Sequence, residues 1–141
     1  MREYLFRGKC IEPENWIGRK EVARGDWVEG SLLSHTEVPR IKGDACMIGC
    51  YVHPATVGQY TGMKDKNGEP IFEGDVVRYE WDDDDTGGIG VTECSVIWHR
   101  TGWYLDCGGD YPIPLFRDGD KEGYVSDCEV IGTIHDALDI I

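Results

Sequence analysis

The sequence predicts a mainly β protein with little helix, built either as a small antiparallel barrel-like fold or as two sheets. Three observations favour this class: period-two alternation in the second half, turn-forming residues between the alternating runs, and few helical segments. Short antiparallel strands in such number usually close on themselves or pack as two sheets. We expect one domain over residues 1–141, with an N-terminal subdomain over residues 1–50 as the alternative.

The predicted strands carry aromatic and β-branched residues on one face. In the first of them Val77, Tyr79 and Trp81 align, whereas Arg78 points to the other side. The same alternation marks four runs, at residues 75–81, 94–99, 103–107 and 130–134. Trp81, Trp98 and Trp103 therefore fall where a core would use them.

Turn-forming residues separate these runs. The pair Asn67-Gly68 is a strong hairpin signal because both residues tolerate positive φ. His99–Gly102 joins two aromatic strands at hairpin distance, and residues 82–90 and 117–123 are expected to be longer acidic loops. Residues 54–58 offer at most one helical turn, and residues 135–141 a short C-terminal turn.

The location expected from the sequence is the cytoplasm. The first residues lack the apolar core of a signal peptide, and no stretch approaches 18 consecutive apolar residues. Six cysteines could form three disulfides in a secreted protein. In a chain of this size without a signal, reduced thiols are expected instead.

The charge excludes two classes of partner. Against 14 Lys and Arg stand 27 Asp and Glu, a formal net charge of −13, so direct nucleic-acid binding and docking on anionic membranes are not expected. The acidity belongs to the later part of the chain. Residues 1–42 hold eight basic and seven acidic residues, whereas residues 43–141 hold six and twenty. A solvated acidic surface that keeps the protein soluble explains this most simply.

Two acidic segments have the spacing of a calcium-binding EF-hand loop. The pattern needs oxygen ligands at positions 1, 3 and 5, Gly at 6 and Glu at 12. The candidate ligands are Asp82, Asp84, Thr86 and Glu93 in the first segment, and Asp118, Asp120, Glu122 and Glu129 in the second. A true EF-hand has flanking helices, whereas strands flank these segments. Solvated turns are therefore favoured, so we expect no cofactor, with calcium as the alternative.

Other chemistry has less support in the sequence. Cys46, Cys50 and His53 form the one cluster of soft metal ligands, but their spacing is not that of a common zinc site. Cys107 and His99 could form a nucleophile–base pair on neighbouring strands, although the alternation does not establish that their side chains point to the same face. No glycine-rich phosphate loop occurs. We therefore expect that the protein is not an enzyme.

A long ungapped run resembles a known family. Residues 57–78, VGQYTGMKDKNGEPIFEGDVVR, resemble the signature of the YopX family of phage and prophage proteins. Residues 6–9 with 26–30 resemble the opening strands of that family, and residues 129–136 its closing strand. The match covers nearly the whole chain in the same order, and residues 81–128 depart most from it.

The resemblance implies a largely β-stranded, self-associating protein encoded by a phage or prophage, and it supplies no catalytic residues. We therefore expect a non-enzymatic accessory protein that acts by binding an unknown phage or host protein, as a homo-oligomer. Two alternatives stay open: an acidic nucleic-acid mimic that blocks a host DNA-binding protein, and a calcium-stabilised β scaffold. The mimic predicts that the acidic residues at 82–85, 118, 120 and 122 form one stripe.

Overall fold

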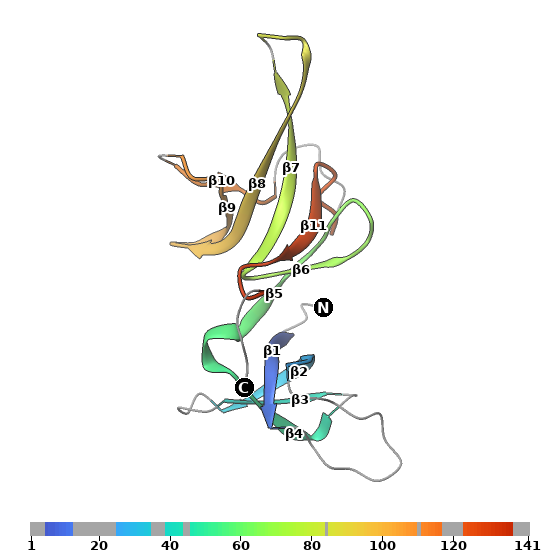
Figure 1. Ribbon diagram of the computed structural model, residues 1–141, viewed down its shortest axis with the longest axis vertical. Helices are drawn as coiled ribbons and strands as arrows, with labels where there is room; N and C mark the ends of the chain where they lie inside the picture. The colour runs from blue at the N-terminus through green and yellow to red at the C-terminus, as the bar shows by residue number, and fades with distance from the viewer. Residues whose placement is uncertain are drawn as a thin grey trace. The chain divides into compact units, whose positions relative to one another are not determined.

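The computed structural model describes residues 5–12, 25–34, 39–43, 46–83, 85–109, 111–116 and 123–136. The chain forms two compact units, one comprising Met1–Tyr60 and Ala137–Ile141 and the other Thr61–Asp136 (Figure 1). The sequence placed the alternative boundary earlier, where the charge changes near residues 43–52. The chain passes from one unit to the other within a strand, β5 (Gly58–Lys64).

In the first unit, four strands pair antiparallel in a closed circuit. The order is β2-β3-β4-β1, and β1 also pairs with β2. The elements are β1 (Phe6–Glu12), β2 (Trp27–Ser34), β3 (Arg40–Gly43), β4 (Cys46–Val52) and the 3-10 turn η1 (Pro54–Thr56). β1 pairs with β2 through Phe6–Lys9 and with β4 through Cys10 and Glu12, and its register with β4 shifts between those two residues. The start of β5 then pairs with the start of β1.

The core of the first unit lies among these strands. It consists of the fully or almost fully buried residues Cys10, Val28, Ile41, Cys50 and Val52. The η1 turn is fixed beside it, because the Lys9 N–H donates to the Thr56 hydroxyl at 2.8 Å. This turn confirms the single helical turn predicted at residues 54–58.

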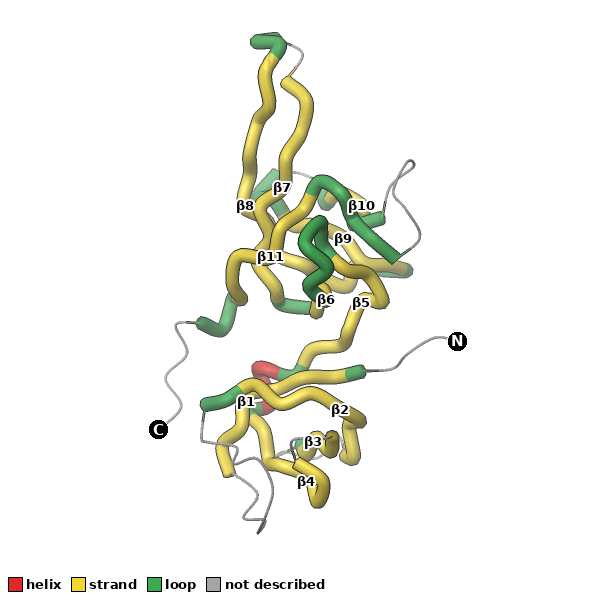
Figure 2. Tube along the Cα trace, turned by 90° about the vertical axis from the view of Figure 1, so that its right-hand side faces the viewer, coloured by secondary structure: helices red, strands yellow, loops and turns green. Residues whose placement is uncertain are grey.

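The second unit is built on a five-stranded antiparallel sheet of order β10-β9-β8-β7-β11 (Figure 2). Its strands are β7 (Asp75–Asp83), β8 (Gly88–His99), β9 (Gly102–Asp106), β10 (Ile113–Pro114) and β11 (Cys128–Thr133), and the short β6 (Pro70–Phe72) pairs with β5. Its core cluster comprises Ile71, Val77, Cys94, Val96, Leu105, Leu115, Val125 and Cys128. The alternation seen in the sequence thus directs its apolar side into this core.

A buried carboxylate closes the predicted Asn67-Gly68 turn. Asp65 is fully buried, and its Oδ1 accepts hydrogen bonds from the N–H groups of Asn67 and Glu69 at 2.8 and 2.9 Å. Its Oδ2 accepts one from the Val130 N–H at 2.8 Å. Asp65 therefore joins the turn to β11, and its desolvation is offset by three backbone donors.

The mainly β prediction is confirmed, and several of its details need correction. The expected loop at residues 82–90 is wrong, because β7 continues to Asp83 and β8 begins at Gly88. The expected core positions of two tryptophans are also wrong: Trp81 is 39% exposed and Trp98 is 51% exposed, whereas Trp103 packs against the core.

Both exposed tryptophans lie on the face that alternation predicts, but they lie near the ends of their strands, beyond the residues of the core cluster. Residues 137–141 of the expected C-terminal turn and residues 117–122 of the second acidic loop lie outside the described residues. Within the described part of the chain, no helix is long and apolar enough to cross a membrane.

Candidate functional site

The β7–β8 hairpin extends beyond the strands on both sides of it. β11 pairs with β7 only as far as Tyr79, and β9 pairs with β8 only from Ser95 onward. β7 and β8 nevertheless stay paired out to Asp83 and Gly88. Residues 80–93 therefore form a two-stranded ribbon, here called the arm, which projects from the sheet in both views (Figures 1 and 2).

The arm is held by a cross-strand contact between a tryptophan and a glycine. Trp81 lies opposite Gly90, and its indole ring covers the position that a β-carbon on Gly90 would occupy. The indole Nε1–H donates to the Thr92 hydroxyl at 3.1 Å. An aromatic ring over a strand glycine shields the backbone and fixes the register. These contacts explain why residues 88–91 continue the strand instead of forming a loop.

The outer face of the arm combines apolar and acidic side chains. Paired residues share a face, and Val91 lies opposite Glu80 while Ile89 lies opposite Asp82. Ile89 is 68% exposed and Val91 is 54% exposed. Glu93 belongs to the same face, two residues along the strand. Branched apolar side chains this exposed, surrounded by carboxylates, are typical of a contact surface.

The backbone of β8 presents hydrogen-bonding groups on the side away from β7. In an antiparallel pair, residues bonded to their partner alternate with residues whose N–H and C=O groups point outward. The Glu80 N–H donates to the Asp127 carbonyl at 2.9 Å, so the Glu80–Val91 pair points outward. By alternation, Ile89 and Glu93 also direct their N–H and C=O groups away from β7. No strand in the described ranges pairs with this edge.

A shallow groove of about 460 Å³ lies along the base of the arm. It is lined by Tyr79, Glu80, Trp81, Asp82, Ile89, Ser126 and Asp127. Two aromatic rings and three carboxylates suit a cationic side chain, which aromatic faces and carboxylates both attract. One cation already reaches its rim, because the Lys66 ammonium lies 3.3 Å from a Glu80 carboxylate oxygen.

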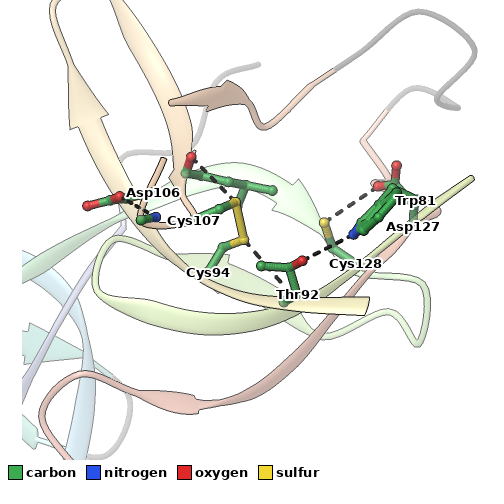
Figure 3. The surroundings of a disulfide bond; sticks show 9 residues. Trp81, Thr92, Cys94, Asp106, Cys107, Asp127 and Cys128 are labelled. Carbon is green, nitrogen blue, oxygen red and sulfur yellow. Dashed lines mark hydrogen bonds between the residues drawn. A yellow bond between two sulfur atoms is a disulfide. The ribbon is translucent and has the colours of Figure 1, made fainter. Parts of the chain in front are cut away.

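A disulfide between Cys94 and Cys107 closes the base of the arm (Figure 3). It joins β8 to the residue that follows β9, with the two Cα atoms 4.4 Å apart. The expectation of reduced thiols is therefore wrong for this pair. Opposite positions on antiparallel strands bring two cysteines to bridging distance, a proximity that their sequence separation of 13 residues conceals. Cys10, Cys50 and Cys128 are buried thiols.

The disulfide also bears on the nucleophile–base pair of Cys107 and His99 that the sequence suggested. The Cys107 sulfur is bonded to Cys94, so it is not a thiolate. The His99 ring lies edge-on to Tyr104, with 5.6 Å between the ring centroids. The structure therefore does not bring Cys107 and His99 together as a catalytic pair.

The first predicted calcium loop is spread along the arm. Asp82 lies opposite Ile89, whereas Glu93 lies four residues further along β8, opposite Arg78. The Thr86 hydroxyl lies in the turn and accepts from the Gly88 N–H at 3.3 Å. Asp82 and Glu93 thus do not converge. Asp84, the remaining predicted ligand, lies outside the described residues.

In the second predicted calcium loop only one ligand can be placed. Asp118, Asp120 and Glu122 lie outside the described residues. Glu129 lies on β11, where its carboxylate is 3.8 Å from the Arg78 guanidinium and 3.9 Å from the Lys66 ammonium. Within the described ranges, no three His, Cys, Asp or Glu side chains gather as a metal site. Calcium binding stays a prediction.

The soft-ligand cluster is only partly described. The Cys50 side chain is buried in the core of the first unit, and the side chain of Cys46 lies outside the description. The His53 Nδ1 accepts a hydrogen bond from the Ala55 N–H at 3.2 Å, as the cap of η1. His53 and Cys50 thus have structural roles that need no zinc.

Sequence reasoning missed the arm and its open edge. The acidic run 82–85 and the glycines at 87, 88 and 90 suggested a loop. The signal that could have corrected this is the alternation of Ile89 and Val91 with Gly90 and Thr92, although its apolar positions lie on the face opposite to that of Cys94 and Val96. A β-branched residue at every second position indicates a strand even where glycines interrupt it.

Comparison with known proteins agrees with the resemblance seen in the sequence. A search of curated proteins found no match. The family model described as YopX protein matches residues 10–138, which include all of the second unit and most of the first. The chain therefore belongs to the YopX family.

Proposed function

We propose that this protein acts by binding another protein and not by catalysis, with the arm as its binding surface. The observation that carries the proposal is the projection of residues 80–93 beyond the sheet, with Ile89 and Val91 exposed among carboxylates. A ribbon that contributes little to the core of its own unit has a simple use as a contact surface. The nucleophile–base pair that the sequence suggested does not form.

We further propose that the protein is a homo-oligomer encoded by a phage or prophage, that it works in the host cytoplasm, and that its partner is a phage or host protein. The resemblance to phage and prophage proteins supports this context. Light scattering on the purified protein tests the oligomer, and a strictly monomeric mass would contradict it.

Capture from host cells carrying the phage tests the binding surface. The bait is the full-length protein, the arm variant Ile89→Ser/Val91→Ser, or Ile134→Ser as control. Ile134 is 58% exposed in the turn after β11 and lies outside the arm. We expect the wild type and Ile134→Ser to retain the same protein and the arm variant to lose it. Identical capture by all three baits would contradict the proposal.

The acidic nucleic-acid mimic remains a second candidate. It is favoured by Glu80, Asp82 and Glu93 on one face of the arm, although Asp83 points to the opposite face. Most of the other residues of the expected acidic stripe lie outside the described ranges. Competition distinguishes this candidate: duplex DNA should release the captured partner from a mimic. Release by high salt but not by DNA would leave ordinary protein binding.

A further inference from the structure

We propose that the outer edge of β8 takes an extended segment of the partner protein as an added strand, and that this segment carries arginine or lysine at alternate positions. The inference rests on the proposed function and names the chemistry of its partner. Its site is the open edge at Ile89, Val91 and Glu93.

The geometry of the edge supplies the backbone contacts. Ile89, Val91 and Glu93 each direct an N–H and a C=O group away from β7, at intervals of about 6.8 Å along the strand. A segment of five extended residues could pair with all of them. Added strands of this kind gain affinity from backbone hydrogen bonds and specificity from alternate side chains.

The charge of the arm specifies which side chains such a segment carries. On the outer face, an added strand meets Glu93 directly and has Glu80 and Asp82 one strand further away, about 10 Å across the sheet. Arg78, which lies opposite Glu93 on β7, directs its guanidinium toward Glu129 on β11, 3.8 Å away. Lysine and arginine side chains are long enough to reach over β8 toward these carboxylates, while their stems cover Ile89 and Val91. Basic residues at every second position therefore fit this face.

A second copy of this chain fits the edge less well. Residues 80–93 contain six acidic residues and no lysine or arginine. Two arms paired edge to edge would place two identical acidic sets in one four-stranded ribbon. Like charges on adjacent strands destabilise pairing, so the charge favours a basic segment over a second arm.

Amide hydrogen exchange in the full-length protein tests the pairing. The probe is a capped nine-residue peptide of alternating arginine and valine, and the control peptide alternates glutamate and valine. Without peptide, we expect slow exchange at Gly90 and Thr92, which face β7, and fast exchange at Ile89, Val91 and Glu93. The arginine peptide should slow the latter three at least tenfold, and the glutamate peptide should not.

Two results of this experiment would overturn the proposal. In one, the arginine peptide binds but hydrogen exchange at the three outward amides stays fast. In the other, these amides are already protected in the protein alone, increasingly so at higher concentration, because a second copy occupies the edge. Retained arm-dependent capture together with failed peptide pairing would overturn the pairing alone. Failure of both would overturn the proposed function as well.

A proline variant isolates the backbone contribution. Val91→Pro removes an N–H that points away from β7, so the β7–β8 ladder keeps its hydrogen bonds. Val91→Thr keeps that backbone N–H and has a side chain of the same shape as valine. We expect Val91→Pro to weaken binding of the arginine peptide at least tenfold, and Val91→Thr to weaken it less than threefold. Equal affinities would contradict pairing at this edge.

Charge variants provide a readout that does not depend on how proline affects the arm. Asp82→Asn/Glu93→Gln removes two carboxylates of the outer face, and Glu69→Gln removes an exposed carboxylate in the turn after β5. We expect the double variant to bind the arginine peptide several-fold more weakly, with an affinity that depends less on salt concentration. Glu69→Gln should leave both unchanged. Equal losses in the two variants would show nonspecific attraction and overturn the proposal.

Discussion

At the scale of single residues, a few polar groups connect segments that are distant in the sequence. Asp65 is the clearest case, because one buried carboxylate receives N–H groups from its own turn and from Val130. The sequence predicts the Asn67-Gly68 turn from local turn chemistry. It does not predict the bond to Val130, because that contact spans 65 residues and depends on the docking of β11.

Asp65→Asn should destabilise the protein by about 3 kcal/mol, because an amide NH₂ in this buried position must then face at least one of three backbone N–H donors. The free energy of unfolding in urea measures the effect. Asp106→Asn is the matched control, since Asp106 Oδ1 accepts only an exposed bond from Gly108 at 3.1 Å. Equal effects of the two variants would contradict the role of Asp65.

Gly90→Ala should displace the Trp81 ring, because the new methyl group would overlap it. We expect a loss of about 1 kcal/mol in unfolding free energy and a shifted NMR signal for the indole N–H that bonds Thr92. Gly88→Ala is the control, because its methyl group would meet only the Thr86 hydroxyl, at 3.5 Å. An unchanged indole signal in Gly90→Ala would count against the cross-strand contact.

At the scale of elements, periodicity in the sequence predicts the strands better than it predicts their ends. The alternating runs at 75–81 and 94–99 both lie in strands of the structure. Their extension to Asp83 and back to Gly88 was missed, because glycines and aspartates disfavour strands when judged locally. The Trp81–Gly90 contact outweighs that preference, and it exists only once the two strands are paired.

The Cys94–Cys107 disulfide joins β8 to the end of β9, and its removal should lower the free energy of unfolding by about 3 kcal/mol. Cys94→Ala/Cys107→Ala should unfold at the same urea concentration with and without dithiothreitol. The wild type should lose stability when the reductant is added. If the stability of the wild type does not change when the reductant is added, the two thiols are reduced in solution, as the sequence alone suggests.

At the scale of the whole molecule, nearly all of the negative charge belongs to one of the two compact units. Thr61–Asp136 contains six basic and eighteen acidic residues, a net charge of −12, which leaves −1 of the total −13 for the other unit. The sequence located the acidity in the later part of the chain. Its concentration along a projecting ribbon depends on β-pairing, and pairing cannot be inferred from composition.

Hydrogen exchange over the whole chain, with and without the captured partner, tests most directly whether the arm is the binding surface. We expect protection on binding to concentrate in residues 80–93, strongest at Ile89, Val91 and Glu93, whose outward N–H groups are not bonded to β7. Little change is expected in the buried core of either unit. Protection confined to other segments, with the arm exchanging as before, would contradict the account.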